Sequence, residues 1–106
     1  MYVIIWEYLV KADQIANFEA TYSARGVWAK LFQKSNAYLG TALLANEGHR
    51  QRYITIDRWM SSQAYESFLS EWKSAYQNLD AQCAGLTERE TLIGKWETVL
   101  RDSATI

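Results

Sequence analysis

The chain has 106 residues, of which 49% are hydrophobic, 22% are charged and 14% are aromatic, with no proline. This length predicts one domain, and the apolar content excludes intrinsic disorder. The formal net charge is -1, and the basic residues form no stripe, which argues against nucleic acid as a partner. No apolar run reaches the roughly 20 residues that a membrane span needs. We therefore expect neither nucleic acid nor a membrane as a partner.

Cysteine and histidine each occur once, as Cys83 and His49. A lone cysteine excludes an intramolecular disulfide, and two such residues far apart in the sequence do not form a zinc site. The apolar start of the chain lacks a basic segment and includes Glu7, so we interpret it as a strand and not as a signal peptide. With no glycine-rich phosphate loop, the sequence predicts a cytosolic protein with no metal and no cofactor.

The first half of the chain predicts one strand and a broken helix. Residues 2–10 are rich in β-branched and aromatic side chains, which favours a strand covered on both faces. Apolar residues at helical spacing follow in 15–22. Residues 25–26 interrupt this spacing with a glycine, and 27–34 resume it. We expect two short helices here.

The second half predicts a hairpin, a long helix and a final strand. Residues 37–46 and 52–59 are the hairpin strands, joined by the turn segment 46–50. The longest apolar stripe at three- and four-residue steps runs through 62–84, which predicts one helix. A last strand is expected at 90–99.

The resulting order is strand, helix, strand, strand, helix, strand, which predicts the α+β ferredoxin-like fold, βαββαβ. We expect a domain over 1–100, with a four-stranded antiparallel sheet, helices on one face, and a polar tail over 101–106. The uncovered sheet face is expected to carry large rings, and such a patch requires a partner or a ligand. The expected partner is a second copy of the chain, facing it sheet to sheet and enclosing a cavity.

Three segments carry a family resemblance: RYITIDRWMSSQAYESF at 52–68, GVWAKLF at 26–32 and YLGT at 38–41. Together with the element order, they resemble the antibiotic biosynthesis monooxygenase family. The resemblance implies a dimeric α/β barrel. Some members of that family oxygenate phenols or quinols with dioxygen and use neither metal nor flavin, and related proteins bind haem.

The resemblance also implies site residues. In quinol-oxygenating members, a tryptophan at the end of the third strand and a tyrosine on the next helix contact the substrate, and the matching positions here are Trp59 and Tyr65. Those members use an asparagine on the third strand, near which this chain has Thr55 and Asp57. The haem-opening members have a histidine on the long helix, which this chain lacks.

The candidate residues lie mainly on one face of the strand 52–59. Tyr53, Thr55, Asp57 and Trp59 alternate with apolar or basic residues, so they share a face. Asp57 is unusual in a strand, and in a cavity its carboxylate would act as a base on a phenol. Glu7 is the equivalent carboxylate of the first strand. Each of these residues also has a structural interpretation, as a core residue, an interface residue or an ion-pair partner.

Two hypotheses of function follow. In the first, the protein is a cofactor-independent monooxygenase of a small aromatic substrate, with Asp57 and Tyr65 catalytic and with Trp59, Tyr53, Thr55 and Glu7 contacting the substrate. In the second, it is a non-catalytic dimer that binds a small molecule or has a structural role. A cavity in which a carboxylate meets aromatic rings favours the first hypothesis, and a cavity filled by the partner favours the second.

Overall fold

The computed structural model describes residues 1–99 of the chain. The expected tail at 101–106 and the last residue of the expected domain lie outside this range. In chain order the elements are β1 (Tyr2–Val10), α1 (Ile15–Tyr22), α2 (Val27–Phe32), β2 (Tyr38–Ala45), β3 (Arg52–Trp59), α3 (Ser62–Glu71), α4 (Lys73–Cys83), a short 3-10 helix (Ala84–Leu86) and β4 (Thr87–Glu97).

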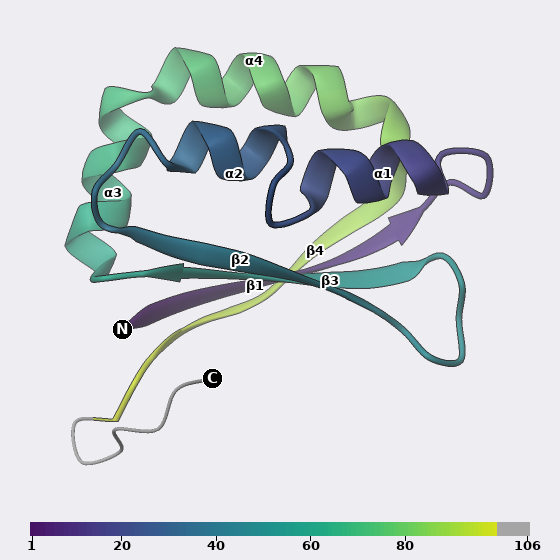
Figure 1. Ribbon diagram of the computed structural model, residues 1–106, viewed down its shortest axis with the longest axis horizontal. Helices are drawn as coiled ribbons and strands as arrows, with labels where there is room; N and C mark the ends of the chain where they lie inside the picture. Colours follow the sequence, from purple (N-terminus) through teal and green to yellow (C-terminus); the bar gives the residue numbers. More distant parts are fainter. Residues whose placement is uncertain (100–106) are drawn as a thin grey trace.

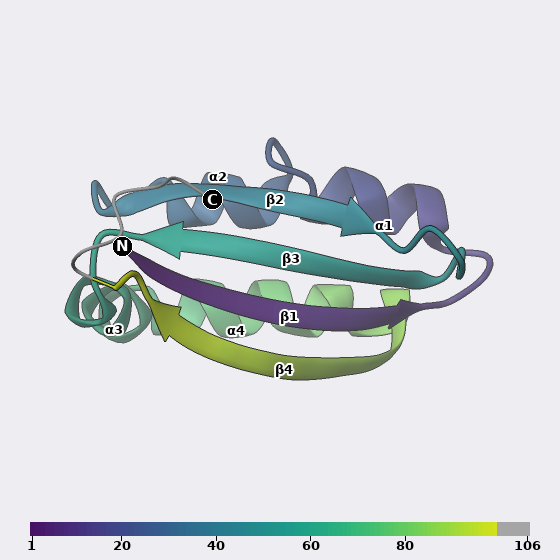
Figure 2. The ribbon, with the colours of Figure 1, turned by 90° about the horizontal axis from the view of Figure 1, so that it is seen from below.

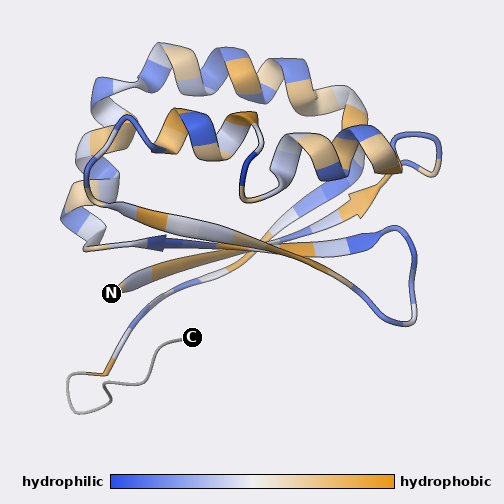
Figure 3. Ribbon diagram, viewed as in Figure 1, coloured by the Kyte–Doolittle hydropathy of each residue, from blue (hydrophilic) through white to orange (hydrophobic). Residues whose placement is uncertain are grey.

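The four strands of the described chain form one antiparallel sheet in the order β2-β3-β1-β4. The helices lie on one side of this sheet (Figure 1), and the view from below shows the other face without a helix over it (Figure 2). This arrangement confirms the predicted ferredoxin-like α+β fold. The loop between β2 and β3 is hydrophilic, and β1 is hydrophobic near both of its ends (Figure 3), as the sequence pattern predicts for a turn and a central strand.

Two elements differ most from the predictions. The expected helix 62–84 is divided at Trp72, whose backbone leaves helical geometry with φ -109° and ψ 25°, and α3 and α4 run in different directions (Figure 1). The apolar spacing does not reveal this break, because it keeps its phase through Trp72. The last strand begins at Thr87 instead of 90, since Thr87 and Arg89 pair with β1 through backbone contacts that their polar side chains do not signal.

The prediction that large rings lie on the uncovered face is wrong for most of them. Tyr53 and Trp59 of β3 and Tyr2 and Tyr8 of β1 face the helices and belong to the buried cluster. The opposite face of β3 carries Ile54, Ile56 and Arg58, because successive side chains of a strand alternate. The helix layer, rather than a second sheet, therefore buries the aromatic face.

The core is built around rings in mutual contact. Trp59 is 0% exposed, and its ring centroid lies 5.2–5.5 Å from the rings of Phe32, Tyr38, Tyr65 and Phe68. Phe18 likewise packs against three rings near α1. Aromatic pairs at such distances add roughly 0.5–1.5 kcal/mol beyond their buried area, so these contacts hold the helices on the sheet.

The start of α3 depends on a side-chain cap. The hydroxyl of Ser61 accepts a hydrogen bond from the backbone N–H of Ala64 at 3.1 Å, as expected for an N-cap serine. The Ser61→Ala variant is expected to lower the free energy of unfolding by about 1 kcal/mol. Urea denaturation measures this loss, with Ser67→Ala, an exposed position within α3, as the control. Equal stabilities of the two variants would contradict the role of the cap.

Within residues 1–99, no helix has the length and apolar character that crossing a membrane requires.

Candidate functional site

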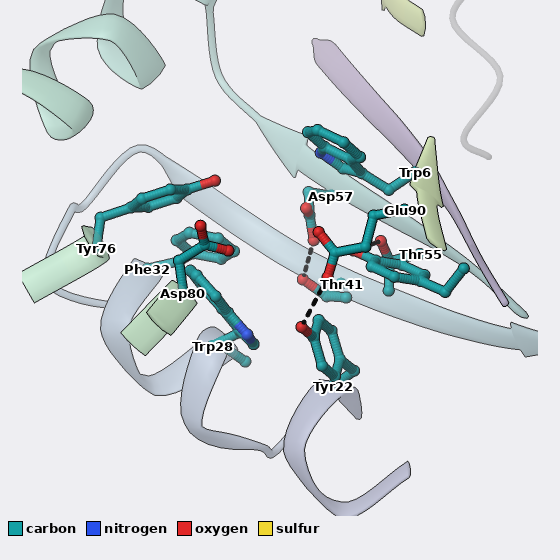
Figure 4. A pocket seen from close by; sticks show the side chains of 12 residues that line it. Trp6, Tyr22, Trp28, Phe32, Thr41, Thr55, Asp57, Tyr76, Asp80 and Glu90 are labelled. Carbon is teal, nitrogen blue, oxygen red and sulfur yellow. Dashed lines mark hydrogen bonds between the residues drawn. The ribbon is translucent and has the colours of Figure 1, made fainter. Parts of the chain in front are cut away.

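A cavity lies between the sheet and the helices of the chain (Figure 4). Its volume is about 150 Å³. An apolar cavity of about 150 Å³ in another protein is known to bind benzene, so this pocket has room for roughly one aromatic ring. All the sheet strands and three helices contribute to its wall, which consists of Trp6, Tyr8, Tyr22, Trp28, Ala29, Phe32, Thr41, Thr55, Asp57, Tyr76, Asp80 and Glu90.

Asp57 is the most buried carboxylate of the pocket, with 8% of the residue exposed. It points toward the helices because it shares a face of β3 with Thr55 and Trp59. Burial raises the pKa of Asp57 to about 6, although the hydrogen bond from Thr41 acts in the opposite direction. The carboxylate is therefore a stronger base than an exposed aspartate and is still largely ionised at neutral pH.

A short chain of hydroxyl groups ends at Asp57. Thr41 is paired with Asp57 across β2 and β3, and its hydroxyl donates to the Asp57 Oδ1 at 2.6 Å. Because a threonine hydroxyl has a single proton, the Tyr38 hydroxyl, 2.5 Å from Thr41 Oγ1, donates to Thr41. These hydrogen bonds fix the orientation of the ionised carboxylate.

An irregularity in β2 makes this chain of hydroxyls possible. In a regular strand Tyr38 and Thr41, three residues apart, would lie on opposite faces. The register shifts between Tyr38 and Gly40, and Gly40 adopts φ 130°, where a side chain is strained. A Cβ atom at Gly40 would also lie 2.8 Å from the Arg58 guanidinium. Gly40 thus places both hydroxyls on the pocket side.

Two further carboxylates, Glu90 of β4 and Asp80 of α4, line the pocket together with Tyr22 and Tyr76 (Figure 4). The Tyr22 hydroxyl donates to Glu90 Oε1 at 3.5 Å. Burial of its carboxylate, and next the charge of Asp80, raise the pKa of Glu90 above its usual range. Burial, followed by the charges of Asp80, Asp57 and Glu90, raises the pKa of Tyr76 to about 12. The carboxylates of Asp57, Asp80 and Glu90 therefore all line the same cavity.

Trp28 of α2 supplies an unused hydrogen-bond donor. It is 8% exposed, and its indole N–H makes no hydrogen bond of regular geometry with the described residues, although Tyr22 and Cys83 lie near it. Its ring nitrogen lies on the side that faces Tyr22 (Figure 4). A buried donor without an acceptor costs roughly 1–3 kcal/mol, so a ligand oxygen at this position would relieve a cost that the free protein carries.

The structure brings two of the six sequence-predicted site residues into this pocket, Asp57 and Thr55. Thr55 is held by a hydrogen bond of 3.1 Å with Tyr8. Trp59 and Tyr65 lie outside the pocket wall. Trp59 packs behind Phe32, which does line the pocket, and Tyr65 packs between Trp59 and Tyr2.

The other two residues, Glu7 and Tyr53, lie at a different place. They line a second hollow that shares no residue with the first. Glu7 is on the uncovered face and forms an ion pair with Arg52. The Tyr53 hydroxyl donates to Glu19 of α1 at 2.5 Å.

Sequence reasoning missed most of the pocket wall. Trp28 and Tyr76 follow helical spacing, and spacing does not separate a core ring from a pocket ring. No local pattern in the sequence distinguishes Glu90 and Asp80 from other charged residues. Gly40 is the signal that could have indicated Thr41, because an isolated glycine in a strand indicates a bulge.

Among residues 1–99, no group of three or more His, Cys, Asp or Glu side chains is arranged to hold a metal ion.

Comparison with known proteins gave matches only among solved structures. No protein-family model matches the sequence, and no curated protein sequence matches it. A structure of SnoaB, a cofactor-independent oxygenase from Streptomyces nogalater, is 18% identical, with a TM-score of 0.70, covering 95% of this chain and 97% of that chain. A structure from Bordetella bronchiseptica, provisionally assigned to the antibiotic biosynthesis monooxygenases, is 22% identical, with a TM-score of 0.73 and coverage of 93% and 97%.

A variant of MhuD, with two manganese protoporphyrin IX molecules bound per active site, is also similar. It is 22% identical, with a TM-score of 0.66, and the match covers 98% of this chain and 100% of that chain. At these identities the comparisons establish the fold. The chain has the ferredoxin-like fold that antibiotic biosynthesis monooxygenases have, as the sequence resemblance implies.

Proposed function

We propose that the protein is a cofactor-independent monooxygenase that uses dioxygen to oxidise a small phenol-type aromatic substrate. The observation that carries the proposal is the buried Asp57 carboxylate, with a pKa raised to about 6, in the wall of an aromatic pocket of about 150 Å³. An oxygenase is supported further by the fold shared with SnoaB, which is described as a cofactor-independent oxygenase.

The reaction requires a base and a site that excludes water. The Asp57 carboxylate accepts the proton of the phenol, and the resulting phenolate passes one electron to dioxygen. Recombination forms a carbon–oxygen bond, and the peroxide formed then loses water to leave a quinone. Overall, a ring C–H and the O–H become two C=O groups, one oxygen atom enters the product and the other leaves as water.

The pocket residues have distinct roles in this scheme. Thr41 and Tyr38 orient the carboxylate. Trp28 and Phe32 enclose the ring of the substrate, and the unused indole N–H of Trp28 donates to its oxygen. Trp59 and Tyr65 act from behind the wall and do not touch the substrate: Trp59 packs against Phe32, and Tyr65 packs against Trp59.

Dioxygen consumption by the purified protein tests the proposal. We expect uptake above the uncatalysed rate with at least one member of a panel of phenols, quinols and anthrone-type compounds, in the presence of a metal chelator. Background uptake with every member would contradict it. If some compounds still bind, that result would favour the second hypothesis, a binding protein without catalysis.

We also propose that the protein forms a homodimer through the uncovered sheet face. This face carries Ile54 and Ile56, and the exposed side chains of Leu44 and Trp96. Trp96, which is 56% exposed, lies over Gly94, where a Cβ atom would meet its ring at 2.9 Å. An apolar face of this kind is unfavourable in water, and a second copy offers a matching face.

A further inference from the structure

All the charged side chains that line the pocket are acidic. Asp57, Asp80 and Glu90 line it, and no lysine, arginine or histidine is among its lining residues. The single ion pair among residues 1–99 joins Glu7 and Arg52 on the uncovered face, so within the described chain these three carboxylates have no cationic partner.

The rest of the wall is suited to a cation. Tyr22, Tyr76 and Trp28 line the same space as the carboxylates (Figure 4). The faces of aromatic rings attract ammonium groups, and such rings around a pocket are the usual means of binding alkylated amines. The protein's own lysines do not fill this role: Lys34 lies over Trp72 and Lys95 over Tyr65, both outside the pocket wall.

A second, independent feature describes the other end of the ligand. The indole N–H of Trp28, more than nine-tenths buried, makes no hydrogen bond of regular geometry with the described residues, although Tyr22 and Cys83 lie near it. An oxygen atom of the ligand would accept a hydrogen bond from this N–H. The volume of about 150 Å³ limits the buried part of the ligand to roughly one ring.

We propose that the ligand of this pocket is a phenolic amine, with one aromatic ring, a hydroxyl group and an ammonium group on a short arm. The ammonium group interacts with Glu90 and Asp80, the rings of Tyr22 and Tyr76 flank it, and the hydroxyl lies between Trp28 and Asp57. This inference names the substrate class of the proposed oxygenase and rests on the same pocket. It also explains how a negatively charged site tolerates a phenolate, because the ammonium group keeps the bound ligand neutral overall.

Three 4-substituted phenols of similar size and different charge test the inference: tyramine, its isostere 4-propylphenol, and the slightly larger 3-(4-hydroxyphenyl)propanoate. Isothermal titration calorimetry of the purified protein at pH 7 gives their affinities. We expect tyramine to bind at least ~10-fold more tightly than 4-propylphenol, and the propanoate to bind most weakly. Equal or tighter binding of 4-propylphenol or the propanoate would overturn the inference, as would the absence of tyramine binding.

Variants test whether the carboxylates of Glu90 and Asp80 cause the preference for tyramine over 4-propylphenol. Glu90→Gln is expected to reduce the preference for tyramine over 4-propylphenol at least ~5-fold, and Asp80→Asn is a second variant with the same expected direction. Glu88→Gln, an exposed position on the same strand outside the pocket wall, is the control and is expected to keep the preference. A preference unchanged in both pocket variants would overturn the assignment.

Failure of the proposed ligand class can be distinguished from failure of the proposed oxygenase activity. Tyramine selectivity without dioxygen uptake would support the ligand class and contradict the oxygenase. Uptake with neutral phenols and no preference for tyramine would contradict the ligand class alone.

Discussion

The Asp57→Asn variant is expected to lower the rate of dioxygen uptake by at least ~100-fold, because a positioned general base contributes about 10²–10⁴-fold. The amide has nearly the same size and can still accept the hydrogen bond of Thr41. The variant therefore removes the base and keeps the geometry of the pocket. Dioxygen consumption at saturating substrate measures the loss.

The same residue sets the pH dependence. The base is active when ionised, so kcat/KM is expected to rise with pH through about 6 and to level off above it. Tyr8, Tyr65 and Tyr76 near it have pKa values raised by burial and do not titrate in this range. Glu90 has a raised pKa as well, and the profile of the Glu90→Gln variant separates its contribution.

The free energy of unfolding is expected to fall as pH rises, whereas kcat/KM is expected to rise. The pKa of Asp57 is higher in the folded protein than its ordinary value of 3.8, so the folded state binds more protons than the unfolded state between pH 4 and about 6. The free energy of unfolding therefore falls as pH rises through this range. Asp57→Asn removes that loss and is expected to stabilise the protein at pH 7–8, by up to about 3 kcal/mol.

Asp13→Asn is the matched control, since Asp13 is exposed in a turn. It is expected to leave both uptake and stability unchanged. An Asp57→Asn variant that keeps most of the uptake would remove Asp57 from the mechanism. One that loses uptake together with stability would indicate a structural carboxylate instead.

The Trp96→Glu variant is expected to raise the dissociation constant of the proposed homodimer at least ~100-fold. Trp96 is exposed in the single chain, so the monomer loses little, whereas the dimer would bury an unpaired charge, which typically costs 3–5 kcal/mol. Sedimentation velocity over a range of protein concentrations measures the shift. Ile56→Glu, near the centre of the same face, is an independent second variant.

Ser74→Glu, at an exposed position of α4, is the control and is expected to leave the dimer intact. Because one chain supplies the pocket wall described above, the Trp96→Glu monomer is expected to keep its affinity for tyramine. A dimer that persists in both sheet-face variants would place the interface elsewhere on the molecule.

The strands and the fold were predictable because alternation and turn residues are local signals. β1 and β3 begin and end where the sequence predicts, and their order with the amphipathic helices defines the topology. The break at Trp72 was not predictable, because the core-facing spacing continues across it. The face occupied by Trp59 was also not predictable: alternation groups the residues of a face but does not say which face the helices cover.

Of the pocket residues, only Asp57 and Thr55 were predicted as site residues from the sequence. Asp57 was noticeable because a carboxylate is rare in a half-buried strand. Trp59 was chosen as a pocket ring through the family resemblance, and it lies one layer behind, against Phe32. Glu90 and Asp80 are far apart in sequence from Asp57 and lie on exposed parts of their elements, so their convergence depends on β4 pairing with β1 and on the path of α4.

The most direct test of the proposed oxygenase activity is dioxygen consumption with tyramine, 4-propylphenol and the quinol panel. It is measured for the wild-type protein and Asp57→Asn, with a chelator present and with ¹⁸O₂ as the gas. We expect consumption of one dioxygen per product, one ¹⁸O atom in the product, and a rate at least ~100-fold lower in the variant. Consumption at background in the wild-type protein, with tyramine bound in the pocket, would contradict the proposed activity and identify a binding protein.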